Sequence, residues 1–316
     1  MRIVYYFVTL FSFFSSTYVL ANNTDEVTHI TWLQSDAAPF HLAKTAQTPD
    51  GGLCDYLVEQ LIIELPDIEH TREMLPQKRI GKYLDEGQQA CYPCMIHRKV
   101  NTPRVIYSVP TTVYPPFAII ASAKTAKVIS QQHSSPINLV KLLTDNKFIF
   151  GQSAARKFTP ELNTIARNTK SDQHTSLSWN SENESSSVIN RLNHGYIDYT
   201  IDYPFLADYY NRFSEFDNVV TLPIADHADK LVLGAIGCST NAPNNFANNA
   251  LKKINRVLTN SILPSAKYQQ TQRVLLENTF ADFDQQYQQY QQQILKLTQP
   301  TTLAEPISLS PSVTEQ

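Results

Sequence analysis

The most regular hydrophobic pattern in the chain lies in residues 188–203. Val188, Ile189 and Leu192 recur at helical spacing. Gly195 follows at the position where a helix commonly ends in a left-handed residue, and after it apolar and polar residues alternate with a period of two. The stretch therefore predicts a helix, a glycine stop and a strand, which together make half of an α/β unit.

The predicted strand ends in polar side chains, because Asp202 and Tyr203 stand directly before Pro204. In open α/β sheets, ligands bind at the carboxyl ends of the strands. We therefore expect the Asp202 carboxylate to bind an ammonium or hydroxyl group of a ligand, and the Tyr203 ring to stack on that ligand. The alternative for Asp202 is a capping role in the turn before the proline.

The rest of the chain alternates strand and helix in two series, which predicts an α/β protein with mostly parallel sheets. A proline-rich, extended segment separates the series, and such connections commonly pass between domains. The expected strands are residues 28–33, 68–75, 88–96, 117–121, 147–150, 176–180, 196–203, 219–224 and 230–237, and the expected helices are residues 53–65, 76–84, 136–143, 158–168, 188–195, 244–263 and 269–297.

Two such series joined by two extended crossings predict two lobes with a cleft and a hinge between them. Ligands bind preferentially at domain interfaces, and hinge closure around a ligand is a known movement. The expected division is residues 22–121 for the first part of lobe 1, 122–228 for lobe 2, 229–298 for the return to lobe 1 with the C-terminal helices, and 299–316 for a disordered tail.

Residues 1–21 have the pattern of a secretory signal peptide. Arg2 gives a positive start, an apolar run follows, and small residues precede the expected cleavage after Ala21. An uncleaved membrane anchor is the alternative, but the apolar run is short for a bilayer span. We therefore expect a protein exported to the periplasm of a Gram-negative cell, an oxidising compartment in which disulfides persist.

Composition excludes several classes of function. The chain has 316 residues, 42% of them hydrophobic, and a net charge of -3, so it lacks the basic signature of a nucleic-acid-binding protein. It contains no G-x-S-x-G, no H-E-x-x-H and no glycine-rich phosphate loop, and it has only eight glycines from which to build such loops. The histidines are too scattered to predict a metal site. We therefore expect neither an enzyme nor a cofactor.

Four cysteines, Cys54, Cys91, Cys94 and Cys238, remain in the exported chain. An even number predicts disulfides in such a compartment, although four cysteines allow three pairings. The C-x-x-C spacing of Cys91 and Cys94 is also that of redox motifs, which need a helix start to lower the pKa of the first thiol. The flanking residues predict a strand, which favours structural disulfides. A zinc site with His97 is less favoured, because no second ligand pair stands at zinc-like spacing.

Several stretches resemble the type II periplasmic solute-binding proteins, in particular a divergent branch of the amino-acid-binding family (family 3). THITWLQSDAAPFHL resembles the first strand and ligand loop of that family, and GGLCDYLVEQLIIEL resembles its first helix. NTPRVIYSVPTTVYPP is similar to the crossing with its Thr-Pro, Arg and Ser-x-Pro pattern, and SSVINRLNHGYIDYTIDYP resembles the helix, glycine and Asp-containing strand at the binding edge of the second lobe. The resemblance covers about residues 28–263.

The resemblance implies a fold and a function. The fold is α/β, the two-lobed type II periplasmic binding protein fold with two hinge crossings. The function is that of a monomeric binding protein that closes on a small polar solute, amino-acid-like or otherwise charged. Such proteins deliver the solute to a membrane permease of the ABC type or report it to a membrane sensor.

Candidate ligand groups follow from the resemblance and from the residue types. Arg98 or Arg104 would clamp a carboxylate with two parallel donors, or each is a solvated loop arginine. Ser153 and Arg156 follow Gly151 at an expected helix start, where they would hold an anion, or they serve only in N-capping. The resemblance places an arginine just after the glycine of FIFGQSAARKF, and this would be Arg156. Other candidates are Asp36 for a cationic ligand and, for stacking, the aromatics Trp32, Phe40, Tyr114 and Tyr203, which could equally be core residues.

Two rival hypotheses stay open. In one, the chain is a periplasmic redox or structural factor that uses Cys91 and Cys94. In the other, it is a relic of the fold that binds no solute and acts through protein contacts alone.

Overall fold

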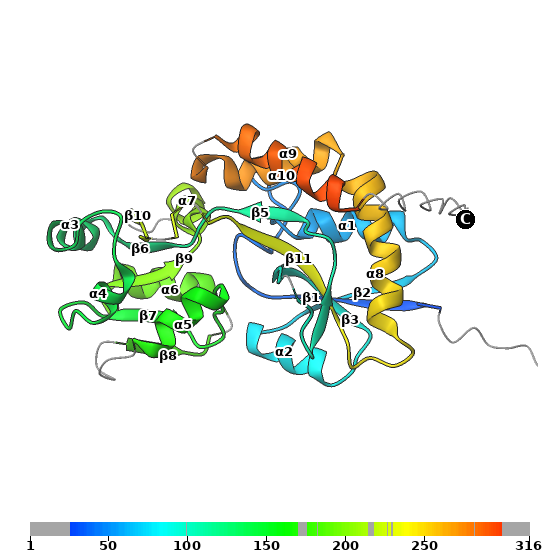
Figure 1. Ribbon diagram of the computed structural model, residues 1–316, viewed down its shortest axis with the longest axis horizontal. Helices are drawn as coiled ribbons and strands as arrows, with labels where there is room; N and C mark the ends of the chain where they lie inside the picture. The colour runs from blue at the N-terminus through cyan, green and yellow to red at the C-terminus, as the bar shows by residue number, and fades with distance from the viewer. Residues whose placement is uncertain are drawn as a thin grey trace, which may run out of the picture.

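The computed structural model describes residues 26–98, 100–169, 176–181, 183–213, 218–225, 227–228, 230–280 and 282–298. The predicted signal peptide and the predicted tail from residue 299 lie outside these ranges. Two lobes, each built on its own sheet, lie side by side along the long axis of the molecule (Figure 1). None of the described helices is long and apolar enough to cross a bilayer.

The sheet of lobe 1 has the order β2-β1-β3-β11-β4, with β5 also paired to β11. Strand β1 runs parallel to β2 and β3, as expected for strand–helix–strand units, and β11 is antiparallel to β3. The elements are β1 (His29–Gln34), α1 (Asp55–Glu64), β2 (Glu69–Met74), α2 (Gln77–Asp85), β3 (Ala90–Ile96), β4 (Val105–Tyr107), β5 (Thr112–Tyr114), β11 (Val232–Ser239) and α8 (Phe246–Val257).

The sheet of lobe 2 has the order β10-β6-β9-β7-β8. Strand β7 is parallel to β8 and β9, while β6 is antiparallel to both of its neighbours. The elements are β6 (Ala118–Ser122), α3 (Ala123–Gln132), α4 (Leu139–Leu143), β7 (Phe150–Ser153), α5 (Pro160–Asn168), β8 (Ser176–Trp179), α6 (Glu184–Asn193), β9 (Tyr199–Asp202), α7 (Pro204–Phe213) and β10 (Val219–Pro223).

The chain crosses between the sheets twice, from β5 to β6 and from β10 to β11. Pro115 and Pro116 have no N–H to donate to a ladder, so the chain leaves the first sheet there. Strand β6 then pairs with β9 and β10, which places residues 118–121 in lobe 2, although the sequence led us to assign them to lobe 1. The crossing therefore lies a few residues earlier than expected.

Two helices were not anticipated from the sequence. The first, α3, begins where the Ser122 hydroxyl accepts a hydrogen bond from the Thr125 amide, the ordinary N-cap arrangement. The second, α7, begins at Pro204 itself. Proline suits the first turn of a helix, because its missing N–H has no partner there in any case. The expected turn after the binding-edge strand is thus a helix start. Gly195 does follow α6 with a φ of 69°, as its position predicted.

The C-terminal helices contact both lobes. Helix α8 continues through a π-turn (Leu258–Ile262) to α9 (Ala266–Leu276), a short 3-10 turn (Glu277–Thr279) and α10 (Phe283–Thr298). Helix α9 packs against α1 of lobe 1 and against α7 of lobe 2 (Figure 1). The Tyr268 hydroxyl donates to the Thr111 carbonyl beside β5, and both terminal nitrogens of Arg212 in α7 lie 3.2 Å from the Val274 carbonyl in α9.

Both disulfides lie in lobe 1, and they pair Cys54 with Cys94 and Cys91 with Cys238. The first ties the start of α1 to β3, and the second ties β3 to β11. The two cysteines of the C-x-x-C sequence are therefore not joined to each other. This result favours the structural interpretation of the cysteines over the redox one, and a disulfide of this kind stabilises a domain by about 2–4 kcal/mol.

Candidate functional site

A cavity of about 550 Å³ lies between the two lobes. Its walls are formed where β1 and β3 of lobe 1 and β7 and β9 of lobe 2 end, together with the first turns of α2 and α6, so it lies at the carboxyl ends of parallel strands. Its charged and amide side chains are Gln77, Lys78, Lys82, Asp85, Arg98 and Arg104 from lobe 1 and Gln152, Arg156, Lys157, Glu184 and Asp202 from lobe 2.

A part-buried ion pair lies in the lobe 2 wall. Arg156 Nη2 donates to Asp202 Oδ1 at 2.5 Å, and the Tyr203 amide donates to the same oxygen at 2.7 Å. Burial raises the pKa of Asp202, although the charge of Arg156 and these hydrogen bonds oppose the rise. The carboxylate at the end of β9 is therefore already bound by a cation that belongs to the chain.

Three aromatic rings surround the guanidinium of Arg156. Its central carbon lies 5.3 Å from the ring centre of Phe117, 5.9 Å from that of Phe158 and 5.1 Å from that of Tyr203. Tyr203 in turn stacks on Phe117 at 4.2 Å. Such contacts are worth about 2 kcal/mol when the cation is desolvated. Arg156 thus occupies the place, between a carboxylate and aromatic faces, that a cationic ligand group would need.

Ser153 and Glu184 lie beside this pair. The Ser153 hydroxyl accepts a hydrogen bond from the Ala155 amide in the turn after β7, and it also bonds to the Glu184 carboxyl. The expected helix start at Ser153 and Arg156 was wrong, because α5 begins only at Pro160, with Thr159 as its N-cap. Burial raises the pKa of Glu184, while Ser153 and the charge of Arg156 act in the opposite direction. Sequence reasoning missed Glu184, although its place in the first turn of α6 is a position where polar groups face a cleft.

The wall of lobe 1 holds a second ion pair, which is exposed. Arg104 donates from Nε and Nη2 to the two oxygens of Asp85, both at 2.6 Å, and these hydrogen bonds lower the pKa of Asp85. Arg104 lines the cavity, but its fork of donors is occupied. Arg98 also lines the cavity and is exposed, and no carboxylate of the described residues lies within ion-pair distance of it. Arg98 is therefore the guanidinium that is free for a ligand.

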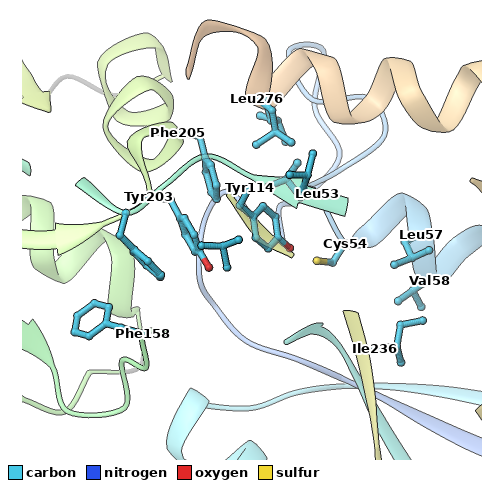
Figure 2. Packing of buried hydrophobic residues seen from close by; sticks show 14 of the residues in the cluster. Leu53, Cys54, Leu57, Val58, Tyr114, Phe158, Tyr203, Phe205, Ile236 and Leu276 are labelled. Atoms are coloured by element: carbon cyan, nitrogen blue, oxygen red, sulfur yellow. The ribbon is translucent and has the colours of Figure 1, made fainter. Parts of the chain in front are cut away.

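Aromatic side chains close the cavity at the hinge. Tyr114 of β5 and Tyr203 after β9 lie between the lobes with Phe205, and Phe158 lies further into lobe 2 (Figure 2). Phe40 meets Tyr114, Tyr203 and Phe205 edge-on, with ring centres 5.4–6.0 Å apart. These rings pack mainly on one another, so they shape the hinge end of the cavity and offer it few free faces.

Two of the predicted ligand residues do not line the cavity. The Trp32 side chain is fully buried beneath α1, and its indole N–H donates to His70 Nδ1 at 3.1 Å. It is thus a core aromatic, because alternate residues of β1 face the α1 side of the sheet. Asp36 is exposed and is absent from the cavity walls. The cavity does bring together the other predicted residues, namely Phe40, Arg98, Arg104, Tyr114, Ser153, Arg156, Asp202 and Tyr203.

Besides Glu184, sequence reasoning missed Gln77, Lys78 and Tyr92. Gln77 and Lys78 begin α2, directly after a parallel strand, and this position in the sequence predicts side chains at the ligand-binding edge of a sheet. The Tyr92 hydroxyl bonds to Ser35 and to Gln77 within the lobe 1 wall. Tyr92 carried no such signal, because it lies inside a strand between two cysteines.

The cavity has a surplus of positive charge. Two of its three carboxylates, Asp85 and Asp202, are paired with arginines. A smaller hollow of about 400 Å³ adjoins it, and the charged side chains that line this hollow are all cationic: Arg98, Arg156, Lys157 and Arg167. Among the described residues, neither Lys78 nor Lys157 has a carboxylate within ion-pair distance. Chemically, this arrangement can hold an anionic group with charge-assisted hydrogen bonds.

Comparison with solved structures identifies the architecture. An ancestral arginine-binding protein bound to arginine matches with a TM-score of 0.57 and 14% identity over 81% of this chain and 100% of that chain. A histidine kinase sensor domain with similarity to periplasmic binding proteins matches with a TM-score of 0.58 and 12% identity over 80% and 97% of the two chains.

A substrate-binding protein of an ABC uptake transporter from Streptococcus pneumoniae with bound histidine matches with a TM-score of 0.57 and 13% identity over 79% and 92% of the two chains. No protein-family model and no curated protein sequence matches the chain. At these identities the likeness shows the fold, and that fold is the two-lobed one that the sequence predicted.

Proposed function

We propose that this chain, which has the fold of the type II periplasmic binding proteins, is an exported, monomeric binding protein that closes on a small anionic solute. The observation that carries the proposal is the cavity between the lobes, in which cationic side chains outnumber carboxylates and most of the carboxylates are already paired. The similar structures include both transporter-associated binding proteins and a kinase sensor domain, so the partner is a membrane permease or a membrane sensor.

The charge of the solute follows from which groups are free. A ligand ammonium group would have to displace Arg156 from Asp202 and from three aromatic rings, and that exchange gains little. A carboxylate or another anion can instead meet Arg98, Lys78 and Lys157 without breaking an existing pair. Charge-assisted bonds of this kind are about twice as strong as neutral ones. The solute would thus be a small carboxylate without an ammonium group, or another small anion.

The movement would be closure of lobe 2 on lobe 1. The first crossing, residues 115–117, has no regular structure, and the described residues of the second, 225, 227–228 and 230–231, lie in turns and loop, so both can absorb changes in backbone angle. Closure would bring the free cations of α2 and β3 toward those of the loop after β7, and an anion between them would remove their mutual repulsion. The division into residues 22–121, 122–228 and 229–298 is kept as a proposal about the moving units, with the boundary near 121 shifted to 117.

Thermal unfolding of the purified protein against amino acids, polyamines, small carboxylates and short peptides tests the proposal. A ligand that binds only the folded state raises the unfolding temperature by mass action. We expect a saturable rise with a small carboxylate that has no ammonium group, and none with polyamines. Arg98→Ala should weaken the affinity at least about tenfold, whereas Arg79→Ala, an exposed arginine of α2 outside the cavity walls, should not change it.

No shift with any compound would contradict the proposal and would favour the rival in which the fold acts by protein contacts alone. Stabilisation by polyamines only would overturn the assignment of the charge but not that of the binding site. The redox rival that uses Cys91 and Cys94 together lacks its required geometry, because each of these cysteines is bonded to a different partner.

A further inference from the structure

A cluster of three potential metal ligands lies behind the lobe 1 wall of the cavity. One nitrogen of His41 and the sulfurs of Cys54 and Cys94 all lie within 4.8 Å of one another. His41 and Cys54 are buried, at 4% and 3% exposure, and Cys94 is part of the cavity wall. Cys54 lies at the start of α1 (Figure 2). The cluster is independent of the residues to which the solute proposal assigns a role.

The orientation of His41 leaves one ring nitrogen free. Its Nδ1 lies 2.8 Å from Asp55 Oδ1, and because a carboxylate only accepts, the ring proton is on Nδ1. Asp55 is itself fixed by Gln34, whose amide donates at 2.9 Å, and by the amides of Leu42 and Gly52, which both donate at 2.7 Å. His41 Nε2 is buried and makes no hydrogen bond within the described part of the chain.

A buried polar atom without a partner is costly, and most such atoms in native proteins have a role. A carboxylate that holds one nitrogen of a histidine while the other presents its lone pair is the usual support of a histidine that binds a metal. In this protein a nitrogen of the His41 ring lies in the same small volume as two sulfurs, and Nε2 is the nitrogen that has no hydrogen bond within the described part of the chain. Two thiolates and an imidazole are ligands that Zn²⁺ prefers.

We propose that reduction of the Cys54–Cys94 disulfide converts this cluster into a Zn²⁺-binding site, with the two thiolates and His41 Nε2 as ligands and a fourth position open to the cavity. The Cα atoms of the two cysteines are 6.1 Å apart. Sulfurs that share one zinc at about 2.3 Å are about 3.8 Å apart, so rotation of the two side chains suffices to form the site.

Two molecules of a small thiol supply the two electrons that reduce the Cys54–Cys94 disulfide. Its thiolate attacks Cys94 Sγ from the cavity, the bond between the two protein sulfurs breaks, and Cys54 leaves as a thiolate. A second thiolate then attacks the outer sulfur of the mixed disulfide, which releases Cys94 as a thiolate and the reductant as its own disulfide. The protons of the two small thiols pass to solvent, and Zn²⁺ binds the two thiolates.

The second disulfide supplies an internal contrast. Cys91 and Cys238 are fully buried in the strands of the lobe 1 sheet, with no exposed surface, so a reductant reaches neither sulfur. The Cys54–Cys94 bond has one sulfur on the cavity wall and the other at a helix start, where free amides stabilise a thiolate. A mild reductant should therefore open the Cys54–Cys94 bond and leave the other intact.

The test uses the whole protein, reduced with a phosphine, freed of the phosphine without air, and titrated with Co²⁺ and then with Zn²⁺. We expect one equivalent of Co²⁺ to give thiolate-to-cobalt absorption that Zn²⁺ removes, and we expect no such absorption in the oxidised protein. His41→Gln keeps an amide donor for Asp55 but has no ligand at the Nε2 position, so it should bind Co²⁺ at least about tenfold more weakly. His97→Gln, which alters a half-buried histidine of lobe 1 outside the cluster, should bind as the unaltered protein does.

Three results would overturn the proposal: no Co²⁺ absorption when peptide mass spectrometry shows Cys54 and Cys94 to be reduced, undiminished binding by the folded His41→Gln variant, or reduction of Cys91 and Cys238 first. If His41→Gln does not fold, protection from alkylation decides the question in the unaltered protein. Zn²⁺ should then protect Cys54 and Cys94 from iodoacetamide, and lack of protection would overturn the site.

Discussion

Two arginine–aspartate pairs face the same cavity, one from each lobe, and they differ in their hydrogen bonds, in their solvent exposure and in the pKa shift of the aspartate. Arg104 and Asp85 meet through two parallel hydrogen bonds with about half of each side chain in water. Arg156 and Asp202 meet through one bond, with side-chain exposures of only 20% and 14%. The pKa of Asp85 is lowered by its arginine, whereas burial raises the pKa of Asp202 in spite of its arginine.

The difference in solvent exposure indicates a different role for each pair. An exposed pair gains little free energy, because water and salt screen it, so Arg104 and Asp85 mainly hold the end of α2 near β4. A part-buried pair has a desolvation cost that offsets much of its attraction, so the pair is weak evidence for stability. We propose, from its position at the carboxyl end of β9, that it has a role in the site. That role would be to keep external cations away from Asp202 and to leave the cavity with a positive surplus.

The largest expected effect is that of Arg156→Ala. The change leaves the part-buried Asp202 without its counter-charge, so we expect a loss of up to about 3–5 kcal/mol in the free energy of unfolding, measured by urea denaturation at neutral pH. Arg104→Ala is the matched control, and it should lose less than about 1 kcal/mol. Equal losses in the two variants would show that burial does not distinguish the pairs.

Asp202→Asn should have an intermediate and pH-dependent effect. Because the folded-state pKa of Asp202 is raised, the stability that its carboxyl contributes is fully present below the unfolded value of about 3.9 and is lost as the pH rises through the folded value. The free energy of unfolding of the unaltered protein should therefore exceed that of the variant by an amount that decreases as the pH rises through this window. Urea titrations at a series of pH values measure it, and a difference that grows with pH would contradict the assignment.

Asp85→Asn should have the smallest effect and the opposite dependence on pH. Its folded-state pKa is lowered, so its stabilisation is present above the unfolded value and is lost as the pH falls through the folded value. We expect a loss below about 1 kcal/mol at neutral pH that disappears in high salt. A loss that persists in high salt would indicate that the pair is shielded from solvent.

The sequence predicted the alternation of the two lobes well, because long amphipathic and apolar stretches such as residues 230–237 have few alternative structures. It also predicted that Asp202 and Arg156 belong to the binding site, and both line the cavity, while their role toward a ligand stays a prediction. It could not show that they bind each other, because they are 46 residues apart and only the packing of β7 beside β9 brings them together. For the same reason it could not choose among the three cysteine pairings, nor unite His41 with Cys54 and Cys94.

Trp32 shows a different limit. Trp32 lies within a predicted strand, where an aromatic side chain can either stack on a ligand or pack in the core. The sequence pattern alone does not distinguish these two roles. The packing of β1 in the sheet decides the matter: Trp32 is opposite Arg72 of β2, and its indole lies beneath α1 and donates to His70, the diagonal neighbour on β2. Helix α7 was missed because Pro204 was interpreted as the end of an element, when proline marks the start of a helix equally well.

The C-terminal helix α9 has a consequence for the energetics of binding. Two crossings alone would let the lobes both bend and twist, so the open protein would sample many orientations. Helix α9 is anchored beside β5 by Tyr268 and to lobe 2 by the bonds between Arg212 and the Val274 carbonyl, which makes a third connection. A receptor joined at three places is preorganised: it has less orientational entropy to lose when it closes, and so it needs fewer ligand contacts for a given affinity.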